Sequence, residues 1–91
     1  MSESKIEDKV VKKAKKLGFL TYKFSSPSNK GVPDRLFICP RGKLFFIEFK
    51  SNTGKLSKSQ QFEIEKLRIA FQTVFVVNDV EVGFEVLNSY L

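Results

Sequence analysis

Two apolar runs separated by only three residues constrain the fold of this 91-residue chain more than any other feature. Residues 34–39 and 43–50 flank Pro40-Arg41-Gly42, a spacing that predicts a three-residue hairpin with glycine in the left-handed position. Apolar side chains occupy both faces of both runs, so the strands should lie at the centre of a sheet that helices cover above and below. The two faces carry Leu36, Ile38, Leu44 and Phe46 on one side, and Phe37, Phe45, Ile47 and Phe49 on the other.

The segment before the hairpin predicts a helix followed by a strand. Residues 5–17 have apolar side chains at helical spacing, on Ile6, Val10, Ala14 and Leu17. Ser4 and Glu7 have the spacing of a capping box at its start, and Gly18 should end it. Residues 19–24 then predict a strand.

The segment after the hairpin predicts a helix, a strand and a last helix. Ser57 and Gln60 have capping-box spacing at the start of a helix that should extend to about residue 71, with Gln60, Ile64, Leu67 and Phe71 on one stripe. Residues 73–77 predict a buried strand, and Asn78 and Glu81 a third capping box. The order αβββαβα predicts an α/β fold, a mixed sheet flanked by helices, whose last strand is parallel to its neighbour.

The predicted hairpin register brings two carboxylates together. With a three-residue turn, Asp34 lies opposite Glu48, their Cβ atoms about 5 Å apart. A two-residue turn would shift the register by one residue and place them on opposite faces. Glu48 and Lys50 share a face because side chains alternate along a strand. Glu48 also lies in a strand that should be buried, where carboxylates are rare unless they are paired or bound to metal.

Asp34, Glu48 and Lys50 have the chemistry of a magnesium-dependent phosphodiesterase. Carboxylates supply the hard oxygen ligands that Mg²⁺ prefers, and a lysine can orient water or stabilise the charge that grows on phosphorus. The chain has no histidine, which excludes Ser-His-Asp and Cys-His triads and the histidine-dependent nucleases. The structural alternative is that Asp34 is a turn acid and that Lys50 only pairs with Glu48. We predict a nuclease.

Length, charge and cysteine content set the other expectations. The length suits one domain that spans residues 1–91. The net charge of +6 favours a nucleic-acid partner, although a lysine-rich face can simply be solvated. The candidate DNA contacts are Lys12, Lys13, Lys16, Lys30 and Lys55. Cys39 is alone, so no disulfide framework is expected, and we see no signal peptide or membrane-spanning stretch. We expect a cytoplasmic protein without a small-molecule cofactor.

Three motifs of this chain resemble the VRR-NUC family of the PD-(D/E)xK nuclease superfamily. They are Gly31-x-Pro33-Asp34-Arg35, Glu48-x-Lys50 and Gly54-Lys55-Leu56-Ser57-x-x-Gln60. The resemblance covers nearly the whole chain and implies a restriction-endonuclease-like fold. It makes Asp34 and Glu48 the metal-binding acids and Lys50 the catalytic lysine. We expect the backbone carbonyl of Phe49 to complete the metal ligands, and Mg²⁺, which Mn²⁺ can replace, to be the cofactor.

The resemblance also implies two further site residues and a substrate. Gln60 matches a glutamine at the start of the family's following helix, and Glu7 an acid of the first helix that lines the site. Both residues have capping as an alternative role. Standalone members of phage type, encoded by phage or bacterial host, are similar to Holliday-junction resolvases, which act on branched DNA as homodimers. The alternatives are a flap-cutting or nicking nuclease, an inactive module that binds branched DNA, and an enzyme that also accepts RNA.

Overall fold

A computed structural model describes all 91 residues, and its elements follow the predicted order αβββαβα. The elements are α1 (Glu3–Lys16), β1 (Leu20–Lys23), β2 (Arg35–Ile38), β3 (Leu44–Phe49), α2 (Lys58–Ile69), β4 (Val74–Val77) and α3 (Val80–Asn88). None of the three helices combines the length and the apolar composition needed to cross a bilayer. The predicted fold class is confirmed.

The four strands form one mixed sheet in the order β1-β2-β3-β4. β1, β2 and β3 pair in antiparallel fashion, whereas β4 runs parallel to β3, as predicted. Ile38 pairs with Leu44, which is the register that a three-residue turn requires. The N–H of Gly42 donates to the carbonyl of Cys39 at 2.8 Å, and Gly42 has a φ of +87°. The turn type, and with it the face on which each side chain lies, is therefore as the sequence predicts.

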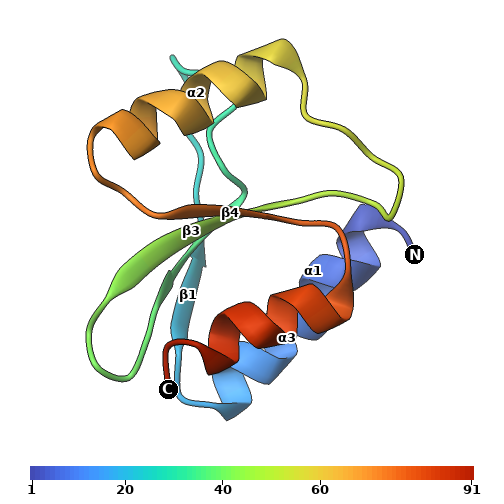
Figure 1. Ribbon diagram of the computed structural model, residues 1–91, viewed down its shortest axis with the longest axis vertical. Coiled ribbons are helices and arrows are strands. Elements are labelled where there is room, and N and C mark those ends of the chain that lie inside the picture. Colours follow the sequence, from blue (N-terminus) through green and yellow to red (C-terminus); the bar gives the residue numbers. More distant parts are fainter.

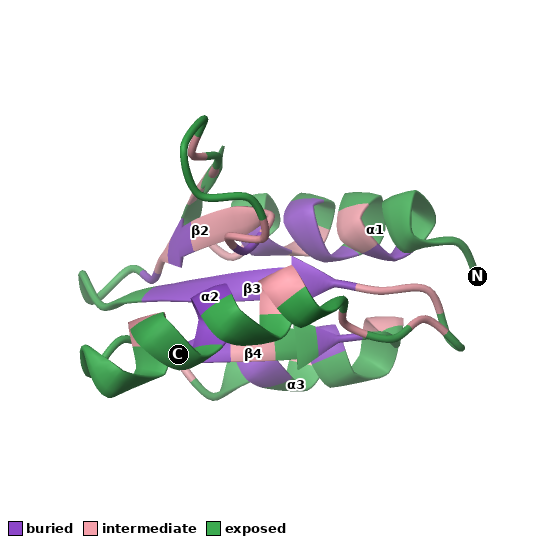
Figure 2. Cartoon of the chain, turned by 90° about the horizontal axis from the view of Figure 1, so that it is seen from above, coloured by how far each residue is buried: buried purple, intermediate pink, exposed green.

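Helices cover the two faces of this sheet unequally. α1 and α3 lie side by side on one face and α2 lies alone on the other (Figure 1). The larger core lies under α1 and α3, where Phe37 and Phe45 are fully buried with their rings stacked 5.4 Å apart. A smaller core joins Phe46 to α2. Figure 2 shows β3 buried along most of its length between these layers.

Burial on both faces was expected for all of the hairpin, and this is wrong at its turn end. Leu44 is 41% exposed, whereas Phe46, two residues further along the same face of β3, is buried. α2 packs through Ile64 over Phe46 and Val74, and it leaves the turn end of this face without a covering helix.

Two of the three predicted N-cap residues are wrong, by two positions in α1 and by one position in α3. α1 begins earlier than expected, because the Ser2 hydroxyl, not that of Ser4, accepts the N–H three residues later at 3.3 Å. α3 is capped by Asp79 and not by Asn78, whose carbonyl instead accepts the side-chain amide of Asn52. In both places two good capping residues lie close together, and tertiary contacts select one of them.

The end of α2 also differs from the prediction. Phe71 was expected on the buried stripe of the helix, but it is 95% exposed and has a φ of +64°. α2 ends at Ile69, and the chain must turn back to reach β4 at Val74. Phe71 therefore occupies the left-handed position that glycine usually takes after a helix.

Candidate active site

The predicted site residues gather at the end of the sheet opposite the hairpin turn. Asp34 immediately precedes β2, Glu48 lies within β3, and Lys50 directly follows β3. Asp34 is held on β3 because its Oδ2 accepts the backbone N–H of Phe49 at 2.8 Å. Its carbonyl also accepts the N–H of Phe24 at 2.9 Å. The hairpin register thus places Asp34 against β3, the strand that carries Glu48.

Glu48 has a fully buried side chain with an incomplete set of partners. Its Oε2 accepts the Gln60 amide at 3.1 Å and lies 3.7 Å from the ammonium group of Lys50. Its Oε1 is buried without a hydrogen-bond partner. A buried carboxylate oxygen that lacks a donor is costly, and such atoms mark places where an ion or ligand completes the structure.

A third carboxylate joins these two. One carboxylate oxygen each from Glu3, Asp34 and Glu48 lie within 4.8 Å of one another. Three carboxylates so close together supply a hard, anionic oxygen set, the type of donor that suits Mg²⁺ or Mn²⁺. Glu3 was not among the predicted site residues, because the first helix was expected to begin at residue 5. The signal was present in Ser2, which as the cap places Glu3 and Glu7 one turn apart on α1.

Glu7 is beside the acidic cluster but is engaged elsewhere. Its Oε2 accepts the Arg35 Nε at 2.6 Å and lies 3.2 Å from the Lys23 ammonium group. Those two cations come from β1 and β2, so this network ties α1 to the sheet next to the site. The structure brings Glu3, and not Glu7, into the group of three carboxylates, and a catalytic role for Glu7 stays a prediction.

The site is electrostatically incomplete without a cation. Burial, and after it the charge of Asp34, raise the pKa of Glu48 to about 8, against the Lys50 ammonium, which lowers it. Burial also raises the pKa of Asp34, against the hydrogen bond from Phe49, which lowers it. One ammonium group does not offset the cost of ionising both carboxylates, whereas a divalent cation would favour the charged form of each.

Gln60 serves as a helix cap and as a site residue at once. Its Oε1 accepts the backbone N–H of Ser57 at 2.9 Å, which completes the predicted capping box of α2. Its Nε2 donates to Glu48. The two roles that the sequence left as alternatives therefore use opposite ends of one amide group.

The five predicted DNA-binding lysines divide into two groups. Lys30 and Lys55 are exposed in loops beside the site. A Cβ on Gly31 would lie 2.5 Å from the Ser59 carbonyl, so the first loop touches the start of α2, and Gly54 packs against Lys50. The other three lysines, Lys12, Lys13 and Lys16, lie in the second half of α1. The carbonyl role of Phe49 stays a prediction.

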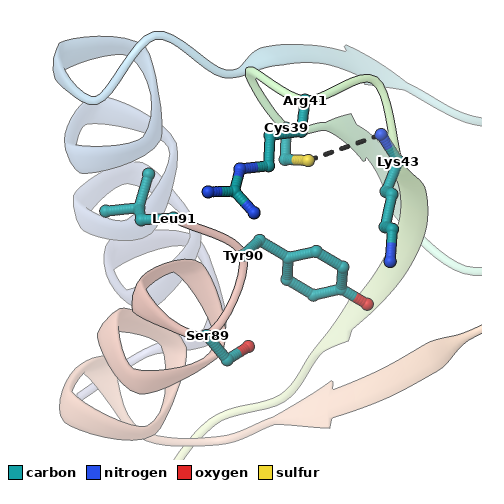
Figure 3. Close-up of a pocket in the computed structure, with 6 residues that line it drawn as sticks. All are labelled: Cys39, Arg41, Lys43, Ser89, Tyr90 and Leu91. Atoms are coloured by element: carbon teal, nitrogen blue, oxygen red, sulfur yellow. Dashed lines mark hydrogen bonds between the residues drawn. The ribbon is translucent and has the colours of Figure 1, made fainter.

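A small hollow of about 150 Å³ lies at the other end of the sheet, beside the hairpin turn. Figure 3 shows the side chains of Arg41, Lys43 and Tyr90 around it, with the N–H of Lys43 bound to the Cys39 sulfur. No acidic side chain lines this hollow. It therefore lacks the donor set for a divalent cation, which only the opposite end of the sheet provides.

Comparison with known proteins adds two relatives. No protein-family model matches the chain. The chain is 36% identical over 81 residues to "Putative nuclease p44" of Acyrthosiphon pisum secondary endosymbiont phage 1. The aligned residues cover 89% of this chain and 87% of that protein. A solved structure described as "VRR_NUC domain" is 30% identical with a TM-score of 0.86, over 98% of this chain and 97% of that one.

Proposed function

The chain belongs to the VRR-NUC family of endonucleases, with a relative of phage type, and from this premise we propose that it hydrolyses phosphodiester bonds in branched DNA with Mg²⁺ or Mn²⁺. The proposed substrate is a four-way junction, cut by a homodimer. The observation that carries the metal dependence is the buried Oε1 of Glu48, which has no partner within the protein.

Asp34, Glu48 and Glu3 are the carboxylates that would hold the cation, together with the backbone carbonyl of Phe49. Their oxygens already lie within 4.8 Å of one another, and the unsatisfied oxygen of Glu48 leaves a donor position for the ion. When bound, a divalent cation supplies polarisation of the phosphate and a lower pKa for water. Hydrogen bonds from Phe49 and Gln60 orient the two central carboxylates, so the donor set is organised before substrate arrives.

Lys50 supplies the positive charge that can act on the phosphate. Its side chain is 12% exposed and its ammonium nitrogen lies 3.7 Å from Glu48, so its position is defined. An ammonium group held at the rim of a partly buried site stabilises the negative charge that develops on a phosphate during attack by water. We propose that Lys50 orients that water and offsets this charge.

Recognition of the substrate should depend on DNA shape. Lys30 and Lys55 flank the site in exposed loops, where their ammonium groups can contact phosphates. Such contacts position the nucleic acid without reading its bases, and they make binding depend steeply on salt. Two copies related by a twofold axis would place paired cuts across a junction, whereas one copy would only nick it.

A cleavage panel tests this function. The wild-type protein is incubated with a four-way junction, a flap, a linear duplex and an RNA duplex, with Mg²⁺, with Mn²⁺ or with a chelator. Lys50→Ala is run beside Lys15→Ala, which removes an exposed lysine from the outer face of α1. We expect metal-dependent paired cuts in the junction, loss of cleavage with retained junction binding in Lys50→Ala, and wild-type behaviour in Lys15→Ala.

Other outcomes would select the alternatives. Wild-type protein that binds junctions yet never cuts with either cation would be a binding module with an inactive site. Preferential cleavage of flaps would assign the second nuclease class, and cleavage of the RNA duplex would extend the substrate. Cutting that persists in the chelator would refute the metal dependence.

A further inference from the structure

A groove of about 380 Å³ is lined by side chains of α1 and α3. These two helices lie on the face of the sheet opposite α2 (Figure 1). The lining of the groove consists of four lysines and two apolar side chains, which are Lys9, Lys12, Lys13, Lys16, Val80 and Phe84. No acidic residue lines it. The groove therefore has an apolar floor, provided by α3, beside a cationic wall that α1 provides.

None of the four lysines is neutralised within the protein. Its four ion pairs involve other lysines and Arg35. The nearest stabilising contact is a cation–π interaction, in which the Lys13 ammonium lies 5.7 Å from the centre of the Phe84 ring. Four unpaired like charges around one groove repel one another, and the binding of a polyanion would relieve this repulsion.

The lysines form a straight track because of helical periodicity. Positions 9, 12, 13 and 16 recur at the spacing that keeps side chains on one stripe of a helix. This stripe is distinct from the buried one formed by Ile6, Val10 and Ala14. At about 1.5 Å per residue, the track is about 10 Å long, so it can contact more than one phosphate of a nucleic-acid backbone.

The far end of the track, at Lys16, is remote from the acidic cluster. Glu3 lies in the first turn of α1, and Lys16 is thirteen residues further along the same helix, about 20 Å away at the α-helical rise. The carboxylate of Glu3 faces the end of the sheet near Asp34, whereas the lysines face α3. A phosphate bound at the far end of the track is thus distinct from a phosphate bound at the catalytic centre.

We propose that the groove between α1 and α3 is a second DNA-binding site, which holds the backbone of a duplex arm away from the scissile phosphate. This inference rests on the proposed function, because it assumes that the catalytic centre acts on DNA. The lysines bind phosphates, and Val80 and Phe84 provide the apolar surface against which the sugars pack. Such a site engages a second arm of a branched substrate without reading its sequence.

The composition of the groove favours DNA over an acidic protein. Protein interfaces depend on aromatic and arginine anchors that fill pockets, and they are depleted in lysine. Here Phe84 is half-buried under Lys13, and the groove has no arginine and no deeper pocket. Regularly spaced lysines instead match the regular charge of a nucleic-acid backbone.

The test measures the salt dependence of binding to a four-way junction in metal-free buffer, where no cleavage occurs. Lys12→Gln combined with Lys16→Gln removes two units of charge from the groove. Lys15→Glu removes the same two units of charge from a neighbouring position that does not line the groove.

We expect the slope of log K against log salt to fall by about 1.8 for the Lys12→Gln, Lys16→Gln double variant (the groove pair), at about 0.9 per phosphate contact. Lys15→Glu should leave the slope unchanged, and Lys12→Arg with Lys16→Arg should restore it.

Equal slopes for the groove pair and the wild-type protein would overturn the inference. Loss of poly-glutamate binding in the groove pair, with unchanged DNA slopes, would assign the groove to an acidic protein and would also overturn it. The two proposals fail separately. A protein that never cuts but shows the slope change loses its proposed function and keeps the second site, whereas a protein that cuts junctions with no slope change loses only the second site.

Discussion

The buried carboxyl group of Glu48 should make the stability of the metal-free protein depend on pH. Its pKa is about 8 in the folded chain, against an ordinary value of 4.5. Between these two values the native state keeps a proton that the unfolded state has lost, so stability falls as pH rises. The loss is about 1.4 kcal/mol per pH unit, or about 5 kcal/mol over the whole window, and it is complete above about pH 8. That is a large fraction of the stability of a small domain.

Glu48→Gln isolates this effect. Glutamine has nearly the same shape, can still bond to Gln60 and cannot ionise, so the pH-dependent loss should disappear. Urea unfolding in a chelator, at several values between about pH 5 and 8, measures the free energy of unfolding. We expect the advantage of Glu48→Gln over the wild-type protein to grow by about 4 kcal/mol across that range. Glu65→Gln, at an exposed position of α2, is the matched control and should show no such change.

The same assay shows what the cation contributes. Mg²⁺ should restore much of the stability of the wild-type protein near the upper end of the range, because it favours the ionised form of Glu48. It should do little for Glu48→Gln. The free energies of unfolding of the wild-type protein and Glu48→Gln, plotted against pH, could instead stay parallel from about pH 5 to 8. That result would mean that Glu48 ionises normally, and it would refute the reasoning about its buried environment.

Three further predictions concern other residues. Asp34→Asn should abolish the rise in melting temperature that Mg²⁺ causes in the wild-type protein, as measured by scanning calorimetry. An unchanged rise would show that Asp34 is not a ligand of the cation. Gly83→Ala should destabilise the fold by about 1–3 kcal/mol, because the added Cβ would lie 2.5 Å from a methyl group of Val10, and urea unfolding measures this. Phe71→Gly should stabilise the protein by about 0.5–1 kcal/mol by relieving the left-handed backbone, whereas Phe71→Ala should give no gain in the same assay.

Part of the site could be predicted because its causes are local. The turn at Pro40-Arg41-Gly42 specifies the register of the hairpin, and the register determines that Asp34 and Glu48 meet. The capping box of Ser57 and Gln60 spans only four residues and was predicted from their spacing, whereas a site role for Gln60 was implied by the family resemblance. In each case the residues that decide the conformation are neighbours in the chain, so their spacing is enough to predict the outcome.

The errors arose where two local solutions are nearly equal in energy. Ser2 and Ser4 both suit the start of α1, and the choice between them decides whether Glu3 belongs to the helix. Glu7 lies one turn from Glu3, but Arg35, twenty-eight residues away in the sequence, engages its carboxylate. The engagement of Glu7 cannot be read from spacing along the chain, because it depends on a contact made only after the sheet and α1 have packed together.

Local sequence signals were enough to predict the order of the elements, the register of the hairpin and the meeting of Asp34, Glu48 and Lys50 at one end of the sheet. These follow from side-chain alternation, helical periodicity and turn chemistry, which act over a few residues. Three other properties could be seen only in the packed molecule: the acid of α1 that joins the cluster, the oxygen of Glu48 that has no partner, and the lysines of α1 that line a groove with Phe84. These properties depend on burial and on distances between distant segments, and packing alone sets both.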